Sequence, residues 1–176
     1  MTKLTNAGPE SSPASASEAD TGRTVELADE QATERCAAAL ANHLTAGLLI
    51  TLNGDLGAGK TSFVRAVLRS LGHQGPVKSP TYTIVEPYAI AGLEINHFDL
   101  YRLGDIEELE LMGFRDYLNA QTICFVEWPQ RAGNYLPVAD LNIDLLALSG
   151  SNITARQLHC VANSEAGVRL LRAWAI

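Results

Sequence analysis

The stretch Gly54-Asp-Leu-Gly-Ala-Gly-Lys60-Thr61 decides the fold, because it matches the phosphate-loop pattern G-x-x-x-x-G-K-[ST] at every position. Its glycines allow backbone conformations closed to other residues, so successive N–H groups can point at a bound phosphate. Lys60 is expected to reach the β- and γ-phosphates of a nucleoside triphosphate, and the Thr61 hydroxyl to ligate Mg²⁺. A chance match in a chain of this length is expected less than roughly one time in a hundred. The candidate nucleotide ligands in the loop are Gly54, Asp55, Leu56, Gly57, Ala58, Gly59, Lys60 and Thr61.

The segments on either side of the loop supply the context that a phosphate loop requires. Residues 48–52 form a short apolar run, which predicts a buried strand ending at the loop. Residues 61–71 carry apolar side chains at helical spacing and end at Gly72, which predicts a helix. The N-terminus of this helix would face the same phosphate.

The rest of the chain alternates between helical and strand patterns. Strands are predicted over 24–27, 81–88, 93–100, 123–126, 141–147 and 153–161, and helices from an N-cap at Asp29 to about Leu44 and over 105–112 and 165–174. This alternation is typical of α/β proteins. We predict a P-loop NTPase-like three-layer sandwich around a central mixed, mostly parallel sheet.

Composition separates the first 22 residues from the remainder. Residues 1–22 have almost no large apolar side chains, so we predict a disordered N-terminal tail. Residues 23–176 are expected to form a single P-loop domain, which the resemblance described below implies to be an ATPase domain. The net charge of −7 argues against direct, non-specific nucleic-acid binding. No apolar run approaches the ~18 residues of a membrane span, and no signal peptide is evident, so we expect a cytoplasmic protein.

The three cysteines are far apart and odd in number. Cys36, Cys124 and Cys160 form no C-x-x-C pair, which argues against a zinc site, a redox motif or a disulfide framework. We expect reduced, buried thiols.

A phosphate loop needs a carboxylate opposite it to hold or organise Mg²⁺, and two acids at strand ends compete for that role. Glu127 follows the apolar run 123–126, which suits a central parallel strand whose carboxyl end would carry a ligand. Asp99 follows a run containing Glu94, Asn96 and His97, which we expect to be more exposed or nearer an edge. We therefore assign Glu127 to the metal shell and Asp99 to water positioning or an outer-shell role. Lys60, Asp99 and Glu127 are the expected catalytic residues.

Other residues near these acids have both functional and structural interpretations. A hydroxyl in Ser79-Pro-Thr-Tyr82 could sense the γ-phosphate or Mg²⁺, or the segment could be a turn before an edge strand. Trp128 fits a contact near the nucleotide and a core or interface position equally well. His97 has no partner at metal-ligand spacing, so we expect it to be packed or hydrogen-bonded. The remaining candidates are expected to be a solvated acidic helix face over 105–110 and local carboxylate partners for Arg102, Arg115 and Arg131.

Five blocks in one order carry a family resemblance. They are the phosphate loop, Val77-Lys-Ser-Pro-Thr-Tyr-Thr-Ile-Val-Glu-Pro-Tyr88, His97-Phe-Asp-Leu-Tyr-Arg-Leu103, Glu107-Glu-Leu-Glu-Leu-Met-Gly113 and Glu127-Trp-Pro-Gln130. Together they resemble the TsaE (YjeE) family of bacterial P-loop ATPases over roughly residues 27–137. Only the first block is the generic phosphate motif, so the resemblance is specific.

The resemblance implies a function and several residue roles. It implies a weak ATPase that uses ATP and Mg²⁺ and acts on the TsaB–TsaD complex. This complex forms the threonylcarbamoyl group on adenosine 37 of tRNAs reading ANN codons, so tRNA would be reached indirectly. It also implies that Thr61 and Glu127 contact Mg²⁺, that Asp99 is the strand-end acid, and that Glu30 and Gln130 are base-side contacts.

Three other functions remain open at this point. A small P-loop metabolite kinase would need an acceptor pocket and usually an arginine-bearing lid, and no arginine cluster follows the central strands. A nucleotide-gated binding module with negligible turnover would also use the loop. A GTPase is disfavoured because no N-K-x-D motif occurs in the chain.

Overall fold

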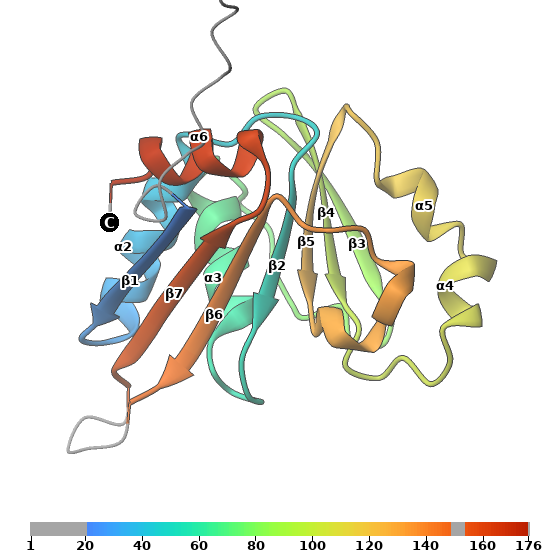
Figure 1. Ribbon diagram of the computed structural model, residues 1–176, viewed down its shortest axis with the longest axis horizontal. Helices are drawn as coiled ribbons and strands as arrows, with labels where there is room; N and C mark the ends of the chain where they lie inside the picture. The colour runs from blue at the N-terminus through green and yellow to red at the C-terminus, as the bar shows by residue number, and fades with distance from the viewer. Residues whose placement is uncertain (1–20, 149–153, 176) are drawn as a thin grey trace, which may run out of the picture.

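The computed structural model describes residues 21–148 and 154–175 (Figure 1). The strands are β1 (Gly22–Leu27), β2 (Leu49–Asn53), β3 (Val85–Ile90), β4 (Leu93–Asp99), β5 (Thr122–Glu127), β6 (Leu141–Ala147) and β7 (Arg156–Ala162). The α-helices are α2 (Glu30–Ala41), α3 (Lys60–Ser70), α4 (Glu107–Leu111), α5 (Phe114–Tyr117) and α6 (Glu165–Ala173), and the 3₁₀ turns are η1 (Pro129–Arg131) and η2 (Gly133–Tyr135). The predicted tail lies almost wholly in residues 1–20, outside the described residues.

The strands form one mixed sheet in the order β1-β7-β6-β2-β5-β4-β3. The pairs β6–β2, β2–β5 and β5–β4 are parallel, whereas β7 is antiparallel to both β1 and β6, and β3 is antiparallel to β4. The predicted α/β fold with a mixed sheet is therefore confirmed. Because the four central strands run the same way, their carboxyl ends meet along one edge.

The alternation of side chains along β5 divides the interior into two cores. Ile123 and Phe125 pack in the core that contains residues of α2, α3 and α6. Cys124 and Val126 point to the opposite face and pack in the core that contains residues of α4, α5 and η2. Both faces of the central strands are thus covered, which explains why their sequence is continuously apolar. Figure 1 shows α2 and α3 behind the sheet and α4 and α5 beyond β3 and β4.

Several element boundaries differ from the predictions for identifiable reasons. The expected strand over 81–88 is wrong in its first half, because residues 81–83 form a turn and β3 begins only at Val85. In this turn the Ile84 N–H donates to the carbonyl oxygen of Pro80 at 2.6 Å, and Ile84 adopts a φ of +65°. The first helix ends at Ala41 rather than near Leu44. Residues 149–153, which include part of the expected strand over 153–161, lie outside the described residues.

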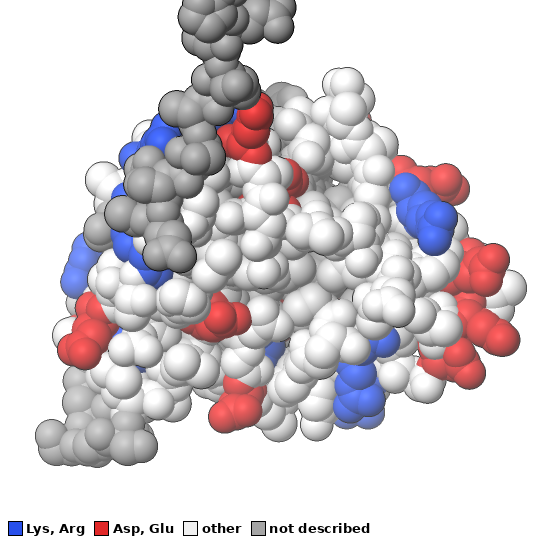
Figure 2. All heavy atoms as spheres, in the orientation of Figure 1, with Lys and Arg blue, Asp and Glu red and all other residues white. Residues whose placement is uncertain are grey.

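The other structural expectations that the described residues test are largely met. Asp29 caps α2, since its Oδ1 accepts a hydrogen bond from Ala32 N at 2.7 Å. All three cysteines are buried and free, and burial raises their pKa values, that of Cys36 to about 12. The acidic residues of α4 are exposed, and on the face in Figure 2 they gather at that end of the molecule. Within the described ranges no helix has the length and apolar character of a membrane span.

Candidate nucleotide and metal site

The phosphate loop leaves the carboxyl end of β2 and leads directly into α3. Gly54 has a φ of +137°, and a Cβ there would lie 2.3 Å from the carbonyl oxygen of Leu145 in β6. Gly59 precedes the helix with a φ of +105°. These positions therefore require glycine, one for its close approach to β6 and both for backbone angles that L-residues rarely adopt. The N-terminal N–H groups of α3 face the space enclosed by the loop.

Lys60 is the first residue of α3 and is only 4% exposed. Its Nζ donates hydrogen bonds to the carbonyl oxygens of Gly54 at 2.7 Å and Asp55 at 2.8 Å. Burial lowers the pKa of Lys60 from its ordinary value, and the charges of Glu127, Asp99 and Asp55 partly oppose this shift. The ammonium group is thus held at the loop, among carboxylates that favour its charged form.

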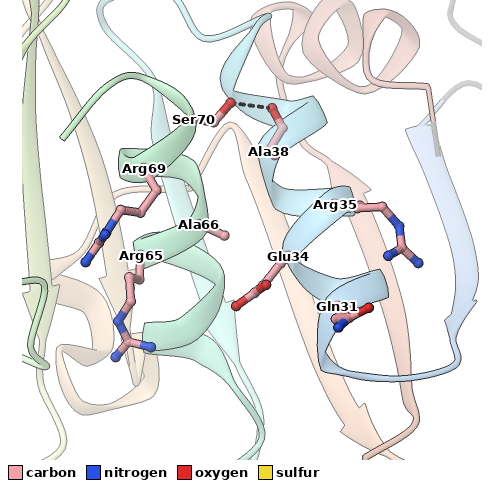
Figure 3. A pocket seen from close by; sticks show the side chains of 8 residues that line it. All are labelled: Gln31, Glu34, Arg35, Ala38, Arg65, Ala66, Arg69 and Ser70. Carbon is pink, nitrogen blue, oxygen red and sulfur yellow. Dashed lines mark hydrogen bonds between the residues drawn. The ribbon is translucent and has the colours of Figure 1, made fainter. Parts of the chain in front are cut away.

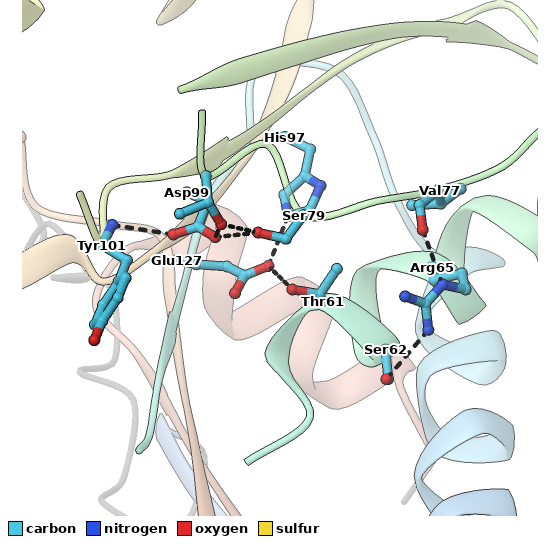
Figure 4. Close-up of polar contacts among 10 residues, drawn as sticks. Thr61, Ser62, Arg65, Val77, Ser79, His97, Asp99, Tyr101 and Glu127 are labelled. Atoms are coloured by element: carbon cyan, nitrogen blue, oxygen red, sulfur yellow. Dashed lines mark hydrogen bonds and ion pairs between the residues drawn. The ribbon is translucent and has the colours of Figure 1, made fainter. Parts of the chain in front are cut away.

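Glu127 ends β5 and lies across from the first turn of α3 (Figure 4). Its Oε1 accepts a hydrogen bond from the Thr61 hydroxyl at 2.7 Å and contacts His97 Nε2 at 2.8 Å. Because an ionised carboxylate only accepts hydrogen bonds, His97 donates through Nε2. The structure thus brings together Glu127 and Thr61, the two residues expected to contact Mg²⁺, and Glu127 Oε2 has no hydrogen-bond partner among the described residues.

His97 is fully buried, and β4 is buried from Ile95 to Asp99, whereas Glu94 is exposed. β4 is the second strand from the sheet edge, which confirms the expectation that it lies nearer an edge than β5. Its interior residues Asn96 and His97 are nevertheless only 6% and 0% exposed. The expectation of greater exposure than β5 is met at Glu94, which is exposed, but not at Asn96 and His97, whose side chains point to opposite faces of the sheet and are covered there. Nδ1 of His97 has no hydrogen-bond partner within the described ranges. The His97 side chain is therefore hydrogen-bonded, as expected, and its partner among the described residues is Glu127.

Asp99 ends β4 and is the direct neighbour of Glu127 in the parallel register. Its Oδ2 accepts hydrogen bonds from the hydroxyl of Thr81 at 2.6 Å and from that of Ser79. Its Oδ1 accepts a hydrogen bond from Tyr101 N at 3.0 Å. Asp99 thereby ties two loop segments together, whereas Glu127 is tied to a helix and a strand.

These residues line one cleft of about 320 Å³. The cleft is lined by Leu56, Gly57, Gly59, Lys60, Thr61, Ser62, Ser79, Thr81, Asp99, Tyr101, Glu127 and Trp128. Residues separated by up to about 70 positions in the sequence meet in this cleft. They belong to the phosphate loop, to the strand-end acids Asp99 and Glu127, and to the segment that carries the Ser79 and Thr81 hydroxyls. A loop and helix N-terminus of this kind can bind an anion, and oxygen ligands of this kind can bind a hard cation.

Trp128 has both of the environments considered for it. It follows β5 with a φ of +58°, its ring centroid lies 4.1 Å from Lys60 Nζ, and it is 4.9 Å from the Tyr101 ring. It lines the cleft, and it also packs against the core on the α4 and α5 face.

Other predicted contacts lie elsewhere. Glu30, in the first turn of α2, and Gln130, in η1, are both exposed, and neither lines the cleft. Arg102 and Arg115 do not pair with carboxylates among the described residues, so that expectation is wrong for them. Their guanidinium groups instead lie over the rings of Tyr82 and Tyr135.

Three contacts around the loop were not predicted from the sequence. Tyr101 and Ser62 line the cleft, and Arg156 Nε at the start of β7 donates to the carbonyl oxygen of Ala58 at 3.0 Å. Tyr101 lies two residues after Asp99 and Ser62 directly after Thr61, so proximity was an available signal. Arg156 carries no such signal, because it lies 98 residues from the loop.

A larger hollow of about 680 Å³ lies between α2 and α3 (Figure 3). Ala66 and Glu34 lie midway along it, and at one end Ser70 Oγ donates a hydrogen bond to the carbonyl oxygen of Ala38. The guanidinium of Arg35 points away from α3 in this view. The hollow has neither a phosphate loop nor converging carboxylates, so volume does not identify the site.

Comparison with known proteins points to one family. The model of the family "Threonylcarbamoyl adenosine biosynthesis protein TsaE" matches residues 27–157. The chain is 48% identical over 134 residues to the Haemophilus influenzae tRNA threonylcarbamoyladenosine biosynthesis protein TsaE, covering 75% of this chain and 81% of that protein. It is 39% identical over 121 residues to the Bacillus subtilis protein of the same name, covering 69% and 73%. The crystal structure of Bacillus subtilis YdiB superposes with a TM-score of 0.72 at 26% identity, covering 87% of this chain and 93% of that one.

Proposed function

The chain belongs to the TsaE family of tRNA threonylcarbamoyladenosine biosynthesis proteins, and we propose that it is a Mg²⁺-dependent ATPase that acts on the TsaB–TsaD complex. Its turnover supports formation of the threonylcarbamoyl group on adenosine 37 of tRNAs that read ANN codons. The tRNA is reached through the complex, in keeping with the net charge of −7 on this chain.

The observation that carries the proposal is the convergence of Lys60, Thr61 and Glu127 in one cleft. A triphosphate in the loop would offer Lys60 Nζ charged oxygens in place of the neutral carbonyls that it contacts, and hydrogen bonds to charged groups are stronger. The N–H groups at the start of α3 complete the anion site. Lys60 is thus the main phosphate ligand among the side chains.

Thr61 and Glu127 are the residues that would hold Mg²⁺. Both supply oxygen, the ligand type that Mg²⁺ prefers, and they already lie 2.7 Å apart through Oγ1 and Oε1. No group of three His, Cys, Asp or Glu side chains suited to a metal occurs among the described residues, which fits an ion shared with substrate phosphates. When bound, Mg²⁺ neutralises charge on the β- and γ-phosphates.

Asp99 would orient the attacking water or an outer-shell ligand of the metal. Hydrolysis passes the γ-phosphoryl group to water and releases ADP and inorganic phosphate, so little is required beyond positioning and charge stabilisation. Asp99 lies beside Glu127 in the sheet and lines the same cleft. The Ser79 and Thr81 hydroxyls that it binds are then suited to report on the γ-phosphate. Glu30 and Gln130 remain candidate base-side contacts on the strength of the family resemblance alone.

The decisive experiment is ATPase activity of the full chain with and without purified TsaB–TsaD. We expect slow turnover alone, stimulation by the complex, and loss of both in Lys60→Ala and Glu127→Ala. Arg169→Ala, an exposed substitution on α6, serves as the control. An unchanged rate with the complex would contradict the assignment to this partner. Recovery of labelled γ-phosphate on a small acceptor instead of as inorganic phosphate would favour a metabolite kinase.

A further inference from the structure

A second pocket adjoins the nucleotide cleft and shares one wall with it. This pocket, of about 350 Å³, is lined by Pro76, Lys78, Ser79, Pro80, Tyr82, Thr83, Glu86 and Tyr88. Ser79 lines both spaces, and its hydroxyl is bonded to Asp99 on the cleft side. A volume of this size accommodates one large side chain. The pocket is therefore separated from the nucleotide site by a single short segment.

The surface beside this pocket carries an aromatic and cationic pair. Tyr82 is 84% exposed, and the guanidinium of Arg102 lies 4.6 Å from the centroid of its ring. Tyrosine and arginine are enriched among the residues that dominate protein–protein binding energy. A tyrosine side chain with this degree of solvent exposure is typical of a protein–protein contact site.

Asp99 connects this pair to the cleft. Its Oδ2 holds the segment of Ser79 and Thr81, which carries Tyr82, and its Oδ1 holds Tyr101 N, next to Arg102. One cleft carboxylate therefore fixes both halves of the surface pair. Whatever engages Asp99 in the cleft changes the bonds that hold Tyr82 and Arg102 in place. Two binding sites are coupled when the ligand at one site changes the contacts that hold the other site in place.

We propose that the pocket with the Tyr82–Arg102 pair is a nucleotide-responsive docking surface for a protein partner, which inserts an apolar side chain flanked by a carboxylate. The walls supplied by Pro76, Pro80 and Tyr88 suit the apolar group, and Lys78 and Arg102 suit the carboxylate. The inference rests on the proposed function for the identity of the partner, the TsaB–TsaD complex.

Charge favours a protein over RNA as the occupant. RNA binding draws on several cations along the phosphate backbone. Here Lys78 and Arg102 are accompanied by the exposed Glu86 in a chain of net charge −7. This surface would therefore repel a polyanion such as RNA, whereas it would bind a single carboxylate beside an apolar group.

The test is binding of purified TsaB–TsaD to the full chain, by calorimetry, with a non-hydrolysable ATP analogue, with ADP and without nucleotide. We expect Tyr82→Ala and Arg102→Ala to weaken the complex at least about tenfold, and to leave affinity for the ATP analogue alone within about twofold. Two variants are matched controls. Leu111→Ala removes an equally exposed apolar group on α4, and Arg115→Ala removes an arginine that lies 4.8 Å from the Tyr135 ring.

The outcomes separate this inference from the proposed function. Wild-type protein that binds no TsaB–TsaD under any nucleotide condition would overturn both. Binding by the wild type that survives Tyr82→Ala and Arg102→Ala, or that Leu111→Ala and Arg115→Ala weaken equally, would overturn the docking surface alone. Labelled tRNA that binds the wild type and is lost in Tyr82→Ala, with TsaB–TsaD binding retained, would assign the surface to RNA. A partner affinity that depends on nucleotide in the wild type, and less so in the two variants, would support the coupling.

Discussion

Glu127 and Asp99 end neighbouring parallel strands at the same level of the sheet, yet their surroundings differ. Both are nearly fully buried, at 2% and 4% exposure. The Glu127 carboxylate is bonded to a helix and a strand through Thr61 and His97, whereas the Asp99 carboxylate is bonded to loop segments around Ser79, Thr81 and Tyr101. Position in a sheet therefore does not determine what a strand-end acid can do.

The difference follows from what fixes each set of partners. Thr61 belongs to α3, whose Phe63 and Val64 are fully buried in the core, so its hydroxyl can move little relative to β5. Residues 79–83 have no ladder to either side and are held mainly by their bonds to Asp99 and by the turn at Ile84. A rigid carboxylate suits a metal ion, and a carboxylate that holds loops suits a sensor.

Replacement of Glu127 should have the largest effect of any change to this comparison. Glu127→Gln keeps an oxygen for Thr61 and His97 but removes the charge, so we expect the rate of ATP hydrolysis to fall at least about a hundredfold. Steady-state phosphate release with varied Mg²⁺ measures this. The matched control is Asp144→Asn, a carboxylate midway along β6 that accepts a hydrogen bond from Asn53 Nδ2 and does not line the cleft. Equal losses in both variants would mean that the fold, and not the metal site, was damaged.

His97 should have the next largest effect, through the position of Glu127. His97→Leu removes one of the two hydrogen bonds that hold the Glu127 carboxylate, and the loss of such outer-shell bonds typically weakens metal binding about 10–100-fold. We expect the Mg²⁺ concentration needed for nucleotide binding to rise by that factor, measured by titration of a fluorescent ATP analogue. His97→Gln, which can place an amide N–H near the same point, should restore most of it. Asn96→Ala removes a buried polar group from the same strand and should have little effect. No recovery in His97→Gln would indicate a packing role only.

Replacement of Asp99 should affect coupling more than metal binding. Asp99→Asn replaces one carboxylate oxygen by an amide NH₂, so with Oδ1 on Tyr101 N its Nδ2 faces the Thr81 hydroxyl, which must then accept instead of donate, and the bonds to the two segments weaken. We expect the nucleotide dependence of TsaB–TsaD affinity to shrink about tenfold, with Mg²⁺-dependent nucleotide affinity changed less than about threefold. Amide hydrogen exchange of Tyr101 and Ile84 gives an independent measurement and should accelerate. Asp105→Asn, on an exposed loop, is the control. A larger Mg²⁺ defect here than in Glu127→Gln would reverse the assigned roles.

The phosphate loop and the strand that ends at Glu127, which form the rigid side of this comparison, were predicted well from the sequence. A glycine pattern between an apolar strand and a helix defines a local geometry, because each residue lies within a few positions of its partners. The apolar run before Glu127 likewise predicted a central strand, since only a strand covered on both faces reads as continuously apolar.

The surroundings of Asp99 and the burial of β4 were harder to predict, because their contacts join segments that are distant in the sequence. Polar letters in β4 indicated exposure, but the structure buries Asn96 and His97 and bonds the histidine to a residue 30 positions away. Residues 81–84 have strand-forming composition, yet the Thr81 hydroxyl bonds to Asp99, 18 positions away, and a turn replaces the strand. Propensity gave the wrong result where a tertiary hydrogen bond decided the backbone.

The smallest expected effect concerns the pKa of Lys60, on which the charges of both carboxylates act. Burial lowers its pKa, and Glu127 opposes this more than Asp99 does. A lysine with a lowered pKa loses its proton below the usual value near 10.5. Its unfolded form then binds more protons, so this group's contribution to stability rises with pH in that window, while phosphate affinity falls as the charge is lost. We expect ADP affinity, measured in EDTA between pH 7 and 10, to fall a few-fold. The fall should begin at lower pH in Glu127→Gln than in Asp99→Asn. The same onset in both variants would show that the two acids influence Lys60 equally, and Lys60→Arg should remove the pH dependence because arginine remains charged throughout.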